Sequence, residues 1–158
     1  MSAPASNVPD DGMLNVLWLQ SGGCGGCSMS LLCADTADFP ALLRRNGIRL
    51  LWHPSLSLDC GTELLSLLDD CLAGRVRLDA LCIEGALLRG PHGSGRFHVL
   101  AGTGEPMIDW VQRLARVARH VVAVGSCAAW GGITATGPNP TEACGLQFDG
   151  GEPGGLLG

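Results

Sequence analysis

Two cysteine motifs, far apart along the chain, contain the residue types best suited to bind a metal cofactor. Cys24-Gly-Gly-Cys27 is a Cys-x-x-Cys motif, and Gly125-Ser126-Cys127 supplies a third cysteine. Thiolates are the ligands that iron–sulfur clusters require, and a Cys-x-x-Cys loop can ligate two irons of one cluster. The intervening glycines leave room for a cluster and let backbone N–H groups turn toward its sulfurs. The residues are therefore typical of an iron–sulfur site, if the fold brings the two motifs together.

The same cysteines are compatible with other kinds of site. A Cys-x-x-Cys at a strand-to-helix turn is also the motif of dithiol oxidoreductases, where the helix N-terminus stabilises the first thiolate. Such a redox pair does not need the third cysteine, Cys127. A zinc site would need four ligands, typically a second Cys-x-x-Cys or paired histidines, and the sequence has neither. We favour the iron–sulfur interpretation, while dithiol redox chemistry, zinc binding and inert thiols stay open at this point.

Three further residues are candidates for the same site. Glu84 follows an apolar run, where its carboxylate could either act at the site or cap a nearby backbone N–H. Cys144 lies in a polar segment and is a candidate fourth ligand, and His53, before Pro54, is more typical of a hydrogen-bonded structural histidine. The remaining cysteines are predicted to be small buried hydrophobic residues: Cys33, Cys60, Cys71 and Cys82.

Composition and charge exclude several classes of protein. The 158 residues are 46% hydrophobic and 16% charged, with a net charge of −5, which argues against a disordered chain and against a nucleic-acid-binding protein. No stretch approaches the ~20 apolar residues of a membrane span. Residues 1–11 contain no twin-Arg pair or basic signal region, so we expect a cytoplasmic protein whose cysteines bind metal or react rather than form disulfides.

Apolar runs alternate with amphipathic segments along the chain. Strands are predicted at Asn15–Gln20, Ile48–Trp52, Ala80–Glu84 and Val121–Val124, with a further short strand at Phe97–Leu100. Helices are predicted at Ser28–Ala34, Phe39–Arg45, Gly61–Ala73 and Pro106–His120. Residues 1–13 are expected to form a loose leader, 14–130 the folded domain with a turn at Gly125–Cys127, and 131–158 a Gly/Pro-rich loop.

Strands that alternate with helices imply parallel strands joined by right-handed crossovers. The predicted fold class is therefore α/β, a flavodoxin-like three-layer domain with a parallel sheet of order 2-1-3-4. In that order the third strand lies between the first and the fourth, and ligands bind beyond the carboxyl ends of the strands. Cys24, Cys27, Cys127 and Glu84 should then converge on one edge of the sheet.

Five ordered motifs together resemble the N-terminal domain of [NiFe]-hydrogenase small subunits: LWLQSGGCGGCSMSLL, LWHPSLS, ALCIEGALLRG, AVGSCAAWGGI and GPNPTEACG. The resemblance implies an electron-transfer subunit with the proximal [4Fe-4S] cluster, next to the NiFe site of a large subunit. Cys24, Cys27 and Cys127 match three ligands of that cluster. Glu84, in the family's Glu-Gly motif, matches a carboxylate near the cluster and the subunit interface, a candidate for proton transfer.

Departures from the family pattern indicate which type of cluster and which subtype of hydrogenase to expect. Gly26 and Gly132 stand where oxygen-tolerant relatives have extra cysteines, which implies an ordinary cubane. The chain has no twin-Arg leader and contains the segment SMSLLCADT, and in both respects it resembles the cytoplasmic H2-sensing (regulatory) hydrogenases, which signal to a histidine kinase. The alternative is the small subunit of an uptake hydrogenase. The family's fourth ligand sits in a downstream Gly-Cys-Pro motif, so we expect this chain to be a fragment.

Overall fold

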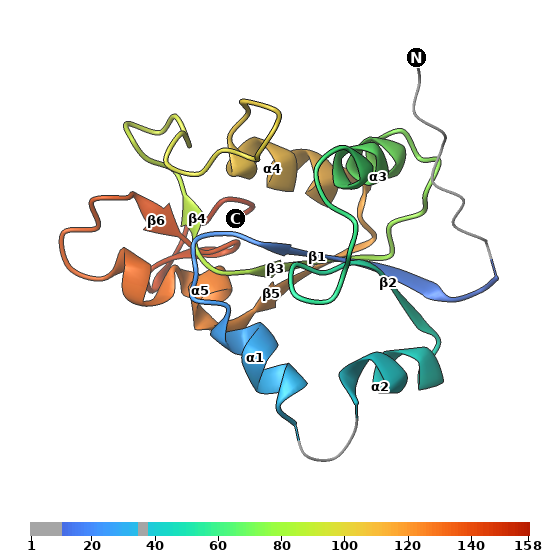
Figure 1. The fold of residues 1–158 in the computed structure, drawn as a ribbon. Coiled ribbons are helices and arrows are strands. Elements are labelled where there is room, and N and C mark those ends of the chain that lie inside the picture. Colours follow the sequence, from blue (N-terminus) through green and yellow to red (C-terminus); the bar gives the residue numbers. More distant parts are fainter. Residues whose placement is uncertain (1–10, 35–37) are drawn as a thin grey trace.

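The computed structural model describes residues 11–34 and 38–158, which are organised around a parallel sheet of four strands (Figure 1). The strands are β1 (Leu14–Gln20), β2 (Ile48–Trp52), β3 (Ala80–Glu84) and β5 (His120–Val124). Their order is β2-β1-β3-β5, and every neighbouring pair is parallel. The predicted order 2-1-3-4 is confirmed, with β5 as the fourth strand. Leu17, Leu81 and Ile83 are fully buried, as expected for central strands covered on both faces.

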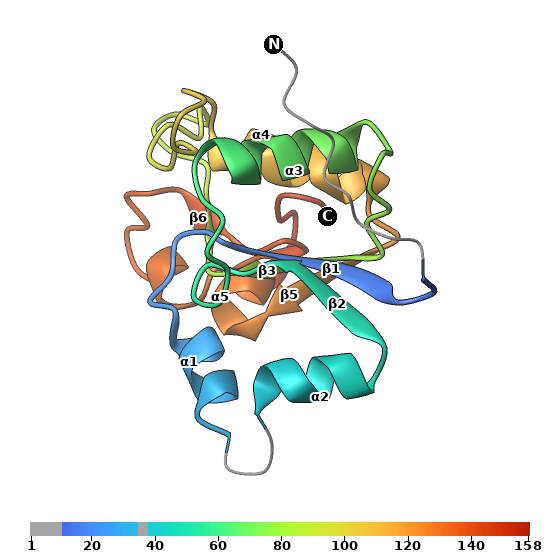
Figure 2. The same cartoon turned by 45° about the vertical axis from the view of Figure 1, so that its right-hand side comes forward.

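Helices cover both faces of the sheet (Figure 2). The helices on one face are α3 (Thr62–Leu72) and α4 (Met107–Val117), and those on the other are α1 (Gly26–Leu32), α2 (Phe39–Arg45) and α5 (Gly125–Trp130). The α4 helix buries Met107, Val111 and Leu114 against the sheet, as its amphipathic pattern predicts. The three layers confirm the α/β, flavodoxin-like fold class.

Two predicted boundaries near the fourth strand are wrong. The helix predicted over Pro106–His120 ends at Val117, because His120 already pairs with Ala80 and its N–H donates to the carbonyl of Asp79 (3.0 Å). The turn predicted at Gly125–Cys127 is instead the first part of α5. In the first case, pairing with β3 decides where β5 begins and therefore where the preceding helix must end.

The segments outside the main sheet contain short strands that apolar periodicity does not reveal. The strand predicted at Phe97–Leu100 is wrong, since only an isolated bridge joins Val99 to Pro106. The segment after β3 forms β4 (Leu87–Leu88), which pairs antiparallel with β6 (Ala143–Cys144). The remaining short elements are η1 (Gly132–Ala135), β7 (Phe148–Asp149) and β8 (Glu152–Pro153). The part of the predicted leader over residues 1–10 lies outside the described residues.

No helix in the described ranges is long and apolar enough to cross a membrane.

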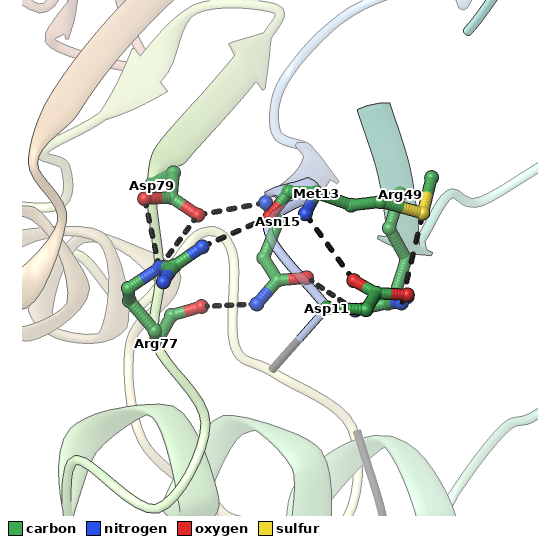
Figure 3. Close-up of polar contacts among 6 residues, drawn as sticks. All are labelled: Asp11, Met13, Asn15, Arg49, Arg77 and Asp79. Carbon is green, nitrogen blue, oxygen red and sulfur yellow. Dashed lines mark hydrogen bonds and ion pairs between the residues drawn. The ribbon is translucent and has the colours of Figure 1, made fainter. Parts of the chain in front are cut away.

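A polar network joins the amino ends of the strands (Figure 3). The buried carboxylate of Asp79 accepts a hydrogen bond from the backbone N–H of Asn15 (2.8 Å) and lies 3.1 Å from Nε of Arg77. The Asn15 side chain donates to the Arg77 carbonyl (2.9 Å) and accepts from Arg49 of β2 (3.2 Å). Arg49 in turn pairs with Asp11. The network holds β1, β2 and the segment before β3 in register at the end opposite the cysteines.

Replacing Asp79 by Ala should lower the free energy of unfolding by about 1–3 kcal/mol, because it leaves the buried N–H of Asn15 without an acceptor. The Arg77 contact contributes little, since that side chain is half exposed. Urea unfolding measures the change, with Asp69→Ala on the exposed face of α3 as the matched control. Equal stabilities for the two variants would contradict the prediction.

Candidate functional site

The three predicted thiols lie at the carboxyl edge of the sheet. Cys24 is exposed in the connection between β1 and α1, and Cys27 lies in the first turn of α1, partly buried. Cys127 is partly buried in α5, which follows β5 directly. The two helices lie side by side at the same end of the sheet (Figures 1 and 2).

Cys27 is the thiol at the centre of this group. Burial raises the pKa of Cys27, and the negative charges of Glu84, Cys127 and Cys24 raise it further, so these groups are close enough to interact. The sulfur of Cys27 also lies against Gly125, two residues before Cys127, where an added Cβ would come within 2.4 Å of it. The structure therefore brings together the thiols and the carboxylate that the sequence predicted to converge.

A glycine lies against each of the three sulfurs. An added Cβ would lie 2.5 Å from Sγ of Cys127 at Gly132, and 3.1 Å from Sγ of Cys24 at Gly26. The absence of a Cβ lets the sulfurs lie close to the backbone at these glycines, and the Gly26 N–H additionally donates to Cys24 (3.4 Å). Close approach of the backbone and N–H donation to sulfur are features that support a ligated cluster.

The described residues contain no group of three or more His, Cys, Asp or Glu side chains that could hold a metal ion. A cluster of several irons differs from one ion, because each thiolate binds a different iron and the thiolates can stand farther apart. A set of three thiols surrounded by glycine thus fits an iron–sulfur cluster better than a mononuclear zinc site.

The close approach of β1 and β3 places the cysteine loop. The N–H groups of Gly22 and Ala86 each donate to the other residue's carbonyl, at 2.9 and 2.8 Å. A Cβ at Gly23 would lie 2.9 Å from Cα of Gly85, so a side chain there would push the two backbones apart. The chain leaving β1 is therefore held directly beside the end of β3, where Glu84 lies.

Glu84 is buried and accepts hydrogen bonds at both carboxylate oxygens. Its Oε1 accepts from the backbone N–H groups of Cys27 and Ser28 (3.1 Å each), and its Oε2 from Trp18 Nε1 (3.1 Å) and from the Ser28 hydroxyl. Burial raises the pKa of Glu84, but the hydrogen bonds from Ser28, Trp18 and Cys27 lower it more, so the pKa is below its ordinary value. The carboxylate therefore caps the first turn of α1, one of the two alternatives raised from the sequence; proton transfer stays a prediction.

The other candidate residues have different surroundings. Cys144 is fully buried in β6, and the charges that act on its thiol come from Arg89 and Asp149. It is not among the groups that shift the pKa of Cys27. His53 is fully buried and hydrogen-bonded, as predicted for a structural histidine.

Two of the four cysteines predicted to be buried are exposed. Cys71 and Cys82 are buried as predicted, and burial raises the pKa of each thiol to about 11. The prediction is wrong for Cys33 and Cys60, which lie at the C-terminal end of α1 and in the connection before α3. Both positions border helices without facing the core.

Ser28 and Trp18 contact Glu84, yet sequence reasoning did not connect them with the site. A serine just after a Cys-x-x-Cys motif, in the first helical turn, is a weak signal for a hydroxyl that bonds near the helix N-terminus. Its partner cannot be read from the chain, because Glu84 and His53 lie far from it in sequence.

Replacing Glu84 by Gln should lower the free energy of unfolding by about 3 kcal/mol, since an amide cannot accept at both positions from these buried donors. Because the folded pKa is below 4.5, the stabilisation by Glu84 is complete above that pH and is lost as the pH falls through the folded pKa. Urea unfolding between pH 7 and about pH 3 should show a smaller acid loss for Glu84→Gln than for the unchanged chain. Glu63→Gln, on the exposed first turn of α3, is the control; an acid loss unchanged by Glu84→Gln would refute the assignment.

Comparison with known proteins places these motifs in a family. The model of the family described as "NADH ubiquinone oxidoreductase, 20 Kd subunit" matches residues 24–153. The matched range includes Cys24, Glu84 and Cys127.

Similar proteins include small subunits of hydrogenases. The chain is 33% identical over 132 residues to the Hydrogenase-2 small chain of Escherichia coli K12, which covers 84% of this chain and 34% of that protein. It is 27% identical over 133 residues to the "Periplasmic [NiFe] hydrogenase small subunit" of Solidesulfovibrio fructosivorans, which covers 84% and 40%. Among solved structures, the [NiFeSe] hydrogenase from Desulfovibrio vulgaris Hildenborough superposes with a TM-score of 0.74 at 29% identity, covering 85% of this chain and 47% of that chain.

The chain thus spans 34% to 40% of the length of these two curated relatives. The family model, by contrast, matches well over half of the 158 residues, from the first cysteine of the site to β8. The chain therefore belongs to the family of the NADH ubiquinone oxidoreductase 20 Kd subunit.

Proposed function

We propose that this chain is the electron-transfer part of a [NiFe]-hydrogenase small subunit and that Cys24, Cys27 and Cys127 bind its proximal [4Fe-4S] cluster. The observation that supports this most is the gathering of three thiols at one sheet edge, with a glycine against each sulfur. The names of the similar proteins support the hydrogenase assignment. The cluster, when bound, supplies one-electron transfer.

The chain's own residues hold the ligands and exclude side chains from the site. Glu84 fixes the first turn of α1, and with it the position of Cys27. Because Gly125 and Gly132 have no Cβ, the sulfurs of Cys27 and Cys127 can lie directly against the backbone there. The proposal does not make this chain the catalytic centre: H2 would be split at the NiFe centre of a large subunit, and proton transfer by Glu84 remains a prediction within it.

The surface around the site supports a partner subunit. Large apolar side chains are exposed on the elements that hold the cysteines or directly follow them, a property more typical of an interface than of a free surface: Met29, Leu31, Trp130 and Ile133. Cys24 is exposed just before α1, the helix that carries Met29 and Leu31.

Three thiols leave one iron of a cubane without a cysteine. Cys144 was the candidate within the chain, but it is buried in β6 beside Arg89 and Asp149. We propose that the fourth ligand is not Cys144 but water, a residue of a partner, or a residue of a segment downstream of Gly158.

Two subtypes are compatible with this site. The amino-acid sequence of residues 28–36 supports a cytoplasmic H2-sensing hydrogenase with a histidine kinase as signalling partner. The names of the similar proteins, which include a periplasmic enzyme, favour an uptake hydrogenase as the alternative. Kinase autophosphorylation measured with and without H2, in the presence of the assembled subunits, separates the two.

Anaerobic reconstitution with iron and sulfide should produce a broad absorption band near about 400 nm in the unchanged chain. Replacing Cys24, Cys27 or Cys127 by Ser should remove most of the band, because each thiol is one ligand. Cys33→Ser, at another exposed thiol, should leave it unchanged.

A dithiol oxidoreductase predicts a different outcome for the same variants. No band would form, and two thiols would oxidise and reduce reversibly in a manner that requires Cys24 and Cys27 but not Cys127. That result would contradict the proposal that the three cysteines bind a cluster.

Replacing Gly125 by Ala should weaken cluster retention, because the new Cβ would lie 2.4 Å from the sulfur of Cys27 and would displace it. Gly102→Ala is a matched control, since Gly102 also has a φ of 81° and its nearest neighbour would be Leu65 at an ordinary 3.6 Å. Both variants should lose about 1–2 kcal/mol of stability from backbone strain. Equal iron content in the two purified variants would argue against a cluster beside Cys27.

A further inference from the structure

A buried hydrogen-bonded chain lies behind the cysteine loop and begins at His53. The His53 side chain is fully buried in the turn that follows β2, with Nε2 3.1 Å from the Ser28 hydroxyl. Its other ring nitrogen, Nδ1, accepts a hydrogen bond from the backbone N–H of Ser55 (3.1 Å). His53 thus connects the β2–α3 segment to the residue immediately after Cys27.

The direction of each hydrogen bond in this chain follows from its ends. A backbone N–H can only donate, so Nδ1 of His53 must be the acceptor and the ring hydrogen must be on Nε2. Nε2–H therefore donates to the Ser28 oxygen, and the Ser28 hydroxyl hydrogen is directed to the Glu84 carboxylate. A doubly protonated ring would place two donors face to face at Ser55. Separately, burial disfavours the charged ring and lowers the pKa of His53.

The ring has little freedom to adopt another orientation. Trp18 packs on it with ring centroids 5.0 Å apart. The backbone N–H of His53 donates to the Ser57 hydroxyl (2.9 Å), and its carbonyl accepts from the N–H of Ser57 (3.0 Å). The local turn therefore holds the backbone of His53 through contacts that do not involve α1.

The consequence for the site passes through Ser28. With its hydroxyl hydrogen directed at Oε2 of Glu84, Ser28 helps to hold the carboxylate so that Oε1 faces the N–H groups of Cys27 and Ser28. Without the His53 donor, the Ser28 hydroxyl could rotate away and the carboxylate would lose one of its anchors. Cys27 belongs to the turn that this carboxylate caps.

We propose that His53 is a positioning residue for the cluster-binding loop: by donating from Nε2 to Ser28 it fixes the Ser28–Glu84 pair and so the place of Cys27. This inference deepens the proposed function and rests on it for the cluster. Removing a residue that hydrogen-bonds to the groups supporting a metal ligand typically changes metal affinity by about 10–100-fold.

The test compares His53→Leu, which removes the donor, with His53→Gln, whose amide nitrogen can take the place of Nε2. Two quantities are measured in the full chain: the rate of cluster loss to an iron chelator, and amide hydrogen exchange at Cys27 and Ser28 without cluster. We expect about tenfold faster cluster loss and faster exchange for His53→Leu, and near-normal values for His53→Gln. His120→Leu, at an exposed histidine of β5, is the control.

Each outcome has a distinct meaning. Uptake of no cluster by the unchanged chain would defeat the proposed function, while amide exchange would still test the positioning role. Normal cluster retention and normal exchange in His53→Leu would overturn the inference and leave the proposed function intact. A His53→Gln variant that behaves like His53→Leu would do the same. If His53→Leu does not fold by circular dichroism, Ser28→Ala breaks the same chain, and unchanged cluster loss and exchange in that variant overturn the inference.

Discussion

Burying a carboxylate is costly unless hydrogen-bond donors replace the water it loses, and Glu84 meets this requirement with donors from two other elements. Trp18 belongs to β1, and Cys27 and Ser28 belong to α1, whereas Glu84 itself ends β3. The carboxylate can stay charged in the interior only while these elements keep their places. The position of the cysteine loop is therefore coupled to the stability of a buried charge rather than to the propensity of a helix of only seven residues.

The same charge affects the chemistry of Cys27. After burial, the carboxylate of Glu84 is the largest influence that raises the pKa of Cys27, so thiolate formation is disfavoured while no cation is present. A coordinated metal reverses this balance, because a bound cation deprotonates the thiol that ligates it. Within the proposed site, Cys27 is thus better suited to form its thiolate together with a metal than before one binds.

The two ends of the sheet have different structural roles. At the amino end, Asp79, Asn15 and Arg49 satisfy backbone groups and hold the strands in register. At the carboxyl end, the backbone turns away through glycines, and buried polar side chains support a group of thiols that is partly open to solvent. This division is what open α/β sheets generally show, with ligands beyond the carboxyl ends of the strands.

Local patterns along the chain were enough to predict the layers and the strand order. The bounds of β2, β3 and α2 agree with the prediction, because short apolar strands and amphipathic helices are recorded in local periodicity. The sequence also indicated the edge at which Cys24, Cys27, Cys127 and Glu84 meet, since strand order and the direction of parallel strands suffice for that. The tertiary structure alone decided the start of β5 at His120, the pairing of β4 with β6, the exposure of Cys33 and Cys60, and the hydrogen-bonded chain from His53 to Glu84. Each of these depends on which distant backbone or side chain arrives opposite a residue, and local patterns contain no information about that.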